Sequence, residues 1–143
     1  MKFWDSSAIL PLIIEEAQTA SMVEIAKEDG ELWVWWSTLL ECRTAIGRRF
    51  REGALTLQAR EQSLELLEEL SANWHEIQPS SSLRELASRL VATHPLRAAD
   101  ALQLAAALVA SMGNPAGDTF ITFDQRLARA AAIEGYKVPY GVG

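Results

Sequence analysis

The sequence has a single cysteine, Cys42, in 143 residues. One cysteine cannot form an intramolecular disulfide, so a disulfide-stapled secreted scaffold is excluded and the cytoplasm is the expected compartment. Long apolar runs are missing as well, because the hydrophobic N-terminal stretch is interrupted by Asp5, Pro11 and the pair Glu15-Glu16. Neither a signal peptide nor a membrane span is therefore expected, and we expect no membrane partner.

Basic residues are also scarce, since 13 Lys and Arg stand against 19 Asp and Glu and the net charge is -6. This balance argues against loose, charge-driven binding to nucleic acid or to an anionic membrane. A nucleic-acid substrate would need phosphate contacts from a few arginines or from a cation bound in an acidic pocket. With few Gly and Pro and 49% hydrophobic residues, the composition is typical of one globular domain, expected to span residues 1–143.

Short apolar runs alternate with longer helical patterns along the chain. Strands alternating with helices imply right-handed crossovers. The predicted fold class is α/β, a single three-layer α/β/α sandwich with a mainly parallel central sheet. The run Trp33-Val34-Trp35-Trp36 is interpreted as core packing in a strand buried on both faces, and Pro95 is predicted near the first position of its helix. Strands are predicted at 2–4, 31–36, 74–78 and 119–123, with a candidate last strand at 137–139, and helices at 16–28, 37–53, 56–73, 83–93, 96–112 and 124–134.

Four carboxylates follow strands or begin helices in this prediction. Asp5 closes the first strand and Asp124 follows the strand 119–123, while Glu41 and Asp100 lie in the first turns of their helices. In a parallel sheet, strand carboxyl ends and helix N-termini share one edge. The four acids are therefore expected at one rim, where they would repel one another strongly without a cation.

Each acid also has an ordinary structural interpretation. Asp100 lies on an otherwise apolar helix face, where an unpaired carboxylate is costly, and Arg97 is the local candidate for a salt bridge. Asp124 could serve as a helix N-cap, and Asp5 as a cap at the end of its strand. Glu41 could simply favour the positive end of its helix dipole. The functional signal is the convergence of all four.

Segments in all four regions carry short motifs around the acids. They are Asp5-Ser6-Ser7-Ala8, Glu41 after a strand and a Ser-Thr helix start, the segment from Leu96 to Ala105, and the segment from Phe120 to Ala131. Their order and spacing resemble a PIN-domain protein over essentially the whole chain, and the most similar subgroup is the VapC-type toxins of toxin-antitoxin pairs. The resemblance implies a metal-dependent endoribonuclease with RNA as substrate and a cognate antitoxin as partner; we also expect a homodimer.

The resemblance also implies roles for individual residues. Ser6 and Thr122 match hydroxyl positions beside the acids, and Gln103 stands where similar sequences often carry His, on the same side of its helix as Asp100. The family's four acidic positions, implied to be catalytic and metal-binding, are occupied here by Asp5, Glu41, Asp100 and Asp124.

The chemistry of oxygen ligands points to the cation. Carboxylates without a nearby His or Cys suit Mg²⁺ or Mn²⁺, and neither histidine of the chain has the spacing of a zinc ligand. Such a cation lets a bound water lose its proton and attack a phosphodiester in line. Asp5 and Asp100 are expected to bind the cation most directly, with Glu41 and Asp124 completing its shell or orienting the water.

Contacts to RNA or antitoxin are predicted for Arg48, Arg49, Arg97 and Arg126, although a solvated charged face is the alternative. In similar proteins an antitoxin segment lies in an apolar groove formed by the helices that correspond to 16–28 and 56–73. A non-catalytic PIN-like interaction module is the alternative function. A receiver-like phosphoacceptor domain fits poorly, because no aspartate lies between Asp29 and Asp100.

Overall fold

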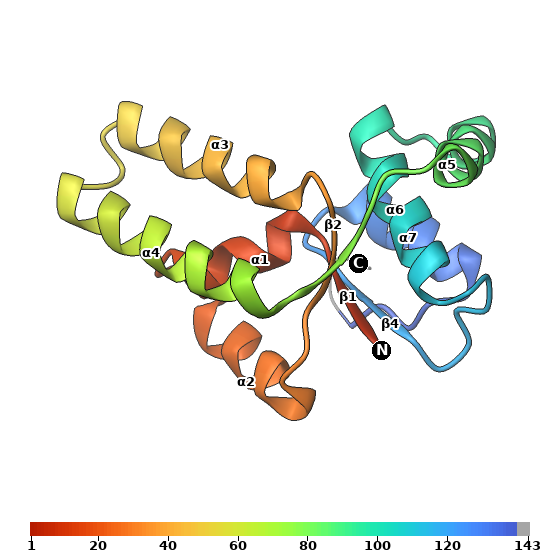
Figure 1. Cartoon of the computed structure of the whole chain (residues 1–143), viewed down its shortest axis with the longest axis horizontal. Helices are drawn as coiled ribbons and strands as arrows, with labels where there is room; N and C mark the ends of the chain where they lie inside the picture. Colours follow the sequence, from red (N-terminus) through yellow and green to blue (C-terminus); the bar gives the residue numbers. More distant parts are fainter. Residues whose placement is uncertain (140–143) are drawn as a thin grey trace.

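The computed structural model describes residues 1–139, which form a central sheet between two groups of helices (Figure 1). The sheet has the strand order β3-β2-β1-β4, and every neighbouring pair of strands is parallel. This confirms the predicted α/β class and parallel sheet. In chain order the elements are β1 (Lys2–Trp4), α1 (Ser6–Ile13), α2 (Thr19–Asp29), β2 (Trp33–Trp35), α3 (Thr38–Arg51), α4 (Leu57–Asn73), β3 (His75–Ile77), α5 (Ser81–Thr93), α6 (Ala98–Ala110), β4 (Thr119–Ile121) and α7 (Gln125–Glu134).

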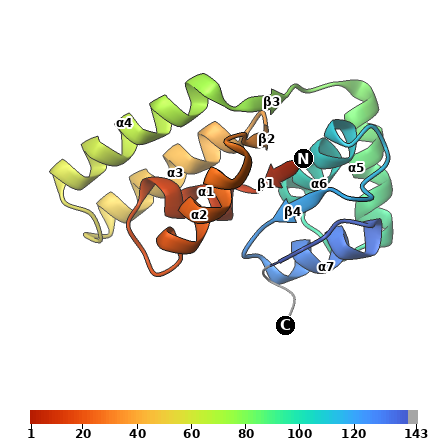
Figure 2. The ribbon, with the colours of Figure 1, turned by 90° about the horizontal axis from the view of Figure 1, so that it is seen from below.

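Alternating side chains of the strands build two separate cores. In β1, Phe3 faces one hydrophobic cluster and Trp4 the other, and both side chains are fully buried. Because successive residues of a strand point to opposite faces, this pattern requires helices on both sides of the sheet. Figures 1 and 2 show α1–α4 on one side and α5–α7 on the other, which confirms the three layers. The same alternation places Trp35 and Phe120 with Phe3, and Val34 and Ile121 with Trp4.

Local sequence signals set several helix ends. The hydroxyl of Thr56 accepts a hydrogen bond from the Ala59 amide at the start of α4, at 3.0 Å. Helix α7 ends at Gly135, whose φ of 114° lies in the left-handed region that favours glycine. These boundaries agree with the prediction within one or two residues.

Two predicted elements need correction, and one helix was missed. Helix α1 was not predicted, because Pro11 lies inside it and removes one backbone hydrogen bond from an apolar segment without helical period. Pro95 is not near the first helical position: Arg97 is the N-cap and α6 spans Ala98–Ala110 rather than 96–112. The last predicted strand is only an isolated parallel bridge between Thr119 and Lys137.

The prediction for the tryptophan run was wrong at its end. Strand β2 covers only Trp33–Trp35, and Trp36 is 52% exposed rather than packed in the core. The strand stops there because the chain turns at residues 36–37 and begins α3 at Thr38.

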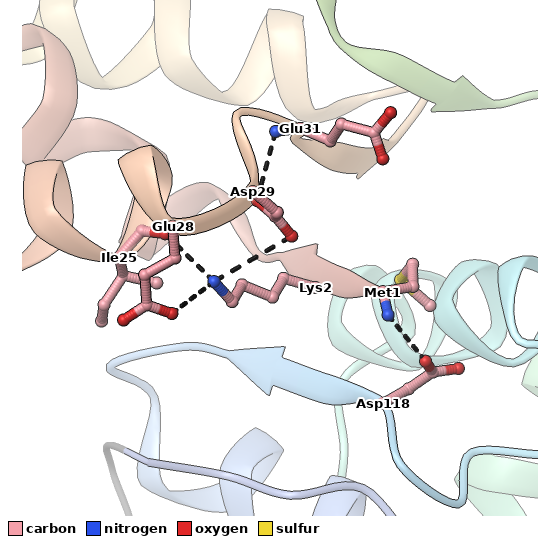
Figure 3. Close-up of polar contacts among 7 residues, drawn as sticks. All are labelled: Met1, Lys2, Ile25, Glu28, Asp29, Glu31 and Asp118. Atoms are coloured by element: carbon pink, nitrogen blue, oxygen red, sulfur yellow. Dashed lines mark hydrogen bonds and ion pairs between the residues drawn. The ribbon is translucent and has the colours of Figure 1, made fainter.

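Polar contacts tie the N-terminal strand to its surroundings (Figure 3). The Lys2 ammonium donates to the Ile25 carbonyl at 3.1 Å and pairs with Glu28 at 2.6 Å, which joins β1 to the end of α2. The Met1 amino group pairs with Asp118 at 2.9 Å, just before β4. Among the helices of residues 1–139, none has the length and apolar character needed to cross a membrane.

Candidate active site

The four predicted acids lie where the parallel strands end and the following helices begin. Asp5 is the N-cap of α1, directly after β1, and Asp124 is the N-cap of α7. Glu41 and Asp100 lie in the first turns of α3 and α6. The charges of the other three acids all act on Asp100, so the tertiary structure brings four distant segments to one site.

Asp5 is buried and held by hydroxyl groups. Its Oδ2 accepts hydrogen bonds from Ser7 at 2.6 Å and from Thr122 at 2.8 Å. The Ser6 hydroxyl lies 3.4 Å from Oδ1. Burial raises the pKa of Asp5, and the hydrogen bonds from Ser7 and Thr122 partly offset this rise. The sequence prediction named Ser6 and Thr122 but missed Ser7. Two adjacent serines follow Asp5, and nothing in the sequence indicates that the second one also bonds to it.

Glu41 is hydrogen-bonded on both carboxylate oxygens. Ser37 donates to Oε1 at 2.6 Å and Ser6 donates to Oε2 at 2.8 Å. Gln103 Nε2 lies 3.3 Å from Oε1 and 3.4 Å from Oε2. Ser37, the N-cap residue of α3, makes no side-chain capping bond and holds Glu41 instead. The donors fix the orientation of this carboxylate.

Asp100 lacks such support. It accepts no hydrogen bond from the described residues, and Arg97 does not form the alternative salt bridge with it, although its charge lowers the pKa slightly. Burial, followed by the charges of Asp124, Asp5 and Glu41, raises the pKa of Asp100 to about 6. A half-buried carboxylate with three acidic neighbours is an anion that the protein itself leaves uncompensated.

Asp124 does cap its helix, because its Oδ1 accepts a hydrogen bond from the Leu127 amide at 2.9 Å. The structural interpretation of this residue is therefore correct, and the capping bond occupies one oxygen of the exposed carboxylate. Thr122 links Asp124 to Asp5, since its hydroxyl donates to Asp5 and accepts from the Asp124 amide at 3.0 Å.

A family model described as the PIN domain matches residues 2–133, nearly the whole described chain. The chain belongs to the PIN domain family. PIN domains are generally a nuclease fold, and they are typically metal-dependent. None of the curated proteins compared with this sequence matches it.

The PIN domain's acids fit a hydrated cation better than a closed metal cage. Within residues 1–139, no three His, Cys, Asp or Glu side chains are arranged as a ready-made metal site. Mg²⁺ does not need one, because it keeps several waters and binds through one or two carboxylates together with substrate phosphate. The donors here are all oxygen atoms, and the unbalanced charge around Asp100 is the electrostatic environment that a divalent cation would neutralise.

Two hollows of the PIN domain open on either side of the acids. One, of about 400 Å³, is lined by Asp100, Asp124, Arg97 and Arg126. The second, of about 390 Å³, is lined by Ser6, Glu41 and Arg48, among others. Three of the four predicted arginines thus lie beside the acids.

The fourth arginine is already paired. Arg49 lies 3.2 Å from Glu16 in an ion pair between α3 and the segment before α2. Cys42, next to Glu41, is fully buried in the hydrophobic core, and burial raises the pKa of its thiol to about 12. The imidazole of His94 contacts Glu134 at 2.7 Å, and His75 stacks on Trp33.

Proposed function

We propose that this PIN domain is a metal-dependent endoribonuclease and acts as the VapC-type toxin of a toxin-antitoxin pair. The observation that carries the proposal is the convergence of four carboxylates on the carboxyl edge of the sheet, where burial and then the charges of the other three acids raise the pKa of Asp100 to about 6. Burying uncompensated acids is costly for a merely structural site. The arrangement therefore favours an enzyme over the non-catalytic interaction module.

The hydrogen bonds distinguish the roles of the acids. Asp100 has both oxygens available, and Asp5 has Oδ1, which receives only a long contact from Ser6. These two residues would hold Mg²⁺ or Mn²⁺, and a bound cation would there supply the acidity that activates water and the charge that stabilises the phosphate. Glu41 and the remaining oxygen of Asp124 would accept protons and orient the attacking water. Ser6 and Thr122 would keep the acids in place.

The substrate and partners follow from charge and shape. Arg97, Arg126 and Arg48 lie beside the acids and would contact RNA phosphates, or acidic groups of an antitoxin. A further hollow of about 310 Å³, between the end of α1 and α4, is lined by Leu12, Ile13 and Leu66 with other side chains. It suits an apolar antitoxin segment. We propose a homodimer in the cytoplasm as the acting form.

Incubation of the purified protein with a mixed RNA pool tests the activity. We expect cleavage with Mg²⁺ or Mn²⁺, none in EDTA, and none with the Asp100→Asn variant. Gln58→Met, an exposed change on α4, is the matched control and should cut like the parent. Absence of cleavage by a folded parent would favour the interaction module. Growth arrest on expression, lost in Asp5→Ala and relieved by a co-expressed antitoxin, would test the toxin role.

A further inference from the structure

Gln103 connects α6 to the start of α3 from within the protein. Its side chain is 1% exposed, although amides are usually found at the surface. Nε2 donates to the Thr38 hydroxyl at 3.1 Å and approaches both oxygens of Glu41. The two hydrogens of one amide group thus serve a hydroxyl and a carboxylate from α3.

The surroundings allow only one orientation of this amide. Turning it over would place Oε1 against the Glu41 carboxylate, where two acceptors would face each other. In the orientation that results, Oε1 is buried and has no hydrogen-bond partner among residues 1–139. A buried carbonyl without a partner lowers stability. The fold tolerates this loss at the position that supplies a donor to Glu41.

A packing role alone does not explain the residue. The next positions of α6, from Leu104 to Leu108, are all buried and apolar, so an apolar side chain at 103 would fit the helix pattern. An apolar side chain there could not donate to Glu41 and Thr38, as the amide of Gln103 does.

We infer that Gln103 is a positioning residue that fixes the Glu41 carboxylate beside Asp5 and Asp100. This inference rests on the proposed function and goes further by assigning the orientation of Glu41 to a residue on a different helix. Ser6 and Ser37 hydroxyls can rotate away from Glu41, whereas the amide nitrogen of Gln103 is also held by its hydrogen bond to Thr38. Without Gln103, Glu41 would lose the donor that reaches both of its oxygens.

The test compares Gln103→Met, which keeps length and removes the donor, with the matched exposed change Gln58→Met in the full chain. Mn²⁺ affinity is measured by electron paramagnetic resonance and RNA cleavage by kcat and KM. In Gln103→Met we expect Mn²⁺ affinity and kcat to fall about 10-fold each, with KM and Tm nearly unchanged. In a Glu41→Gln background, the same Gln103 change should alter Mn²⁺ affinity less than about 2-fold, because Gln103 acts through Glu41.

A third readout does not depend on nuclease activity. The side-chain amide resonances of Gln103, followed by NMR, should shift and exchange faster with solvent in Glu41→Gln. Unchanged resonances, or a Mn²⁺ affinity that is equal or higher in Gln103→Met, would overturn the inference. An equal fall of Mn²⁺ affinity in parent and Glu41→Gln backgrounds would do so too. If the parent cuts no RNA while the NMR and Mn²⁺ results hold, the proposed function fails and the positioning role stands.

Discussion

The two helical layers bury their surfaces in different ways. The layer of α5–α7 packs small side chains closely against the sheet, whereas the layer of α1–α4 fills its core with large ones such as Trp4, Ile9 and Met22. Small side chains let helices approach closely. They also leave few neighbouring atoms that can move to fill a cavity made by a substitution. The alanines in the core cluster of the α5–α7 layer are Ala87, Ala101, Ala105, Ala106, Ala107, Ala130 and Ala131.

The acids divide between the same two layers. Asp5 and Glu41 belong to the elements of the α1–α4 layer and receive hydroxyl hydrogen bonds, while Asp100 begins α6 in the other layer without any. Asp5 and Glu41 are therefore held in position by their neighbours and Asp124 by its capping bond, whereas Asp100 is left electrostatically unbalanced. A bound cation would balance the charge around Asp100.

The largest difference between the two layers should appear in the free energy of unfolding when the same substitution is made in each core. Leu90 in α5 and Leu67 in α4 are both almost fully buried. We expect Leu90→Ala to lower the free energy of unfolding by about 4 kcal/mol and Leu67→Ala by about 2–3 kcal/mol, because large neighbours can partly fill the second cavity. Urea unfolding measures both. Equal losses would show that the two cores relax alike.

Substitution of Asp100 and substitution of Asp5 should have similar effects on RNA cleavage but different effects on Tm. Asp100→Asn is expected to reduce RNA cleavage by more than about 100-fold, since even outer partners of metal sites are worth about 10- to 100-fold. Asp5→Ala should reduce cleavage similarly, but it also removes the acceptor for Ser7 and Thr122. Cleavage rates and Tm in EDTA distinguish the variants. A variant of Asp100 that unfolds in EDTA while the parent stays folded would indicate a structural acid.

The pH dependence of stability should further distinguish Asp100 from the acids that are held by hydrogen bonds. The pKa of Asp100 rises from 3.8 to about 6 on folding, so its protonated form favours the native state and this contribution is lost as pH rises through about 6. In EDTA at pH 7, Asp100→Asn should therefore be more stable than the parent by about 1 kcal/mol, after allowance for solvent screening. The gap should close near pH 4. Tm measured against pH checks this, and a gap that widens in acid would contradict it.

The smallest effect concerns the arginines on either side of the acids. Replacing Arg97 and Arg126 by Glu should weaken RNA binding by about 1 kcal/mol for each lost phosphate contact and flatten its salt dependence. Arg48→Glu tests the hollow that Ser6 and Glu41 line. Binding measured at several salt concentrations would show which layer carries the RNA, and unchanged slopes in both cases would identify the arginines as a solvated face.

Much of the fold could be predicted because its signals are local. The Thr56 cap, the Gly135 stop and the short apolar runs between polar helices each act within a few residues. The same reasoning failed for α1, because Pro11 argues against a helix that tertiary packing stabilises. It also failed for Trp36, because the exposure of this side chain depends on where the chain turns. The burial of a residue at the end of a strand depends on which helices cover that part of the sheet, and a local sequence pattern does not contain this information.

Local sequence patterns were enough to predict the parallel α/β architecture and the positions of the four acids at strand ends and helix starts, because periodicity and capping are properties of neighbouring residues. Which acids receive long-range support depends on the folded arrangement. Folding places Ser6 and Gln103 on Glu41, Thr122 on Asp5 and nothing on Asp100 within the described chain. The contact between Thr122 and Asp5 joins residues 117 positions apart, and such contacts exist only after the layers have packed on the sheet.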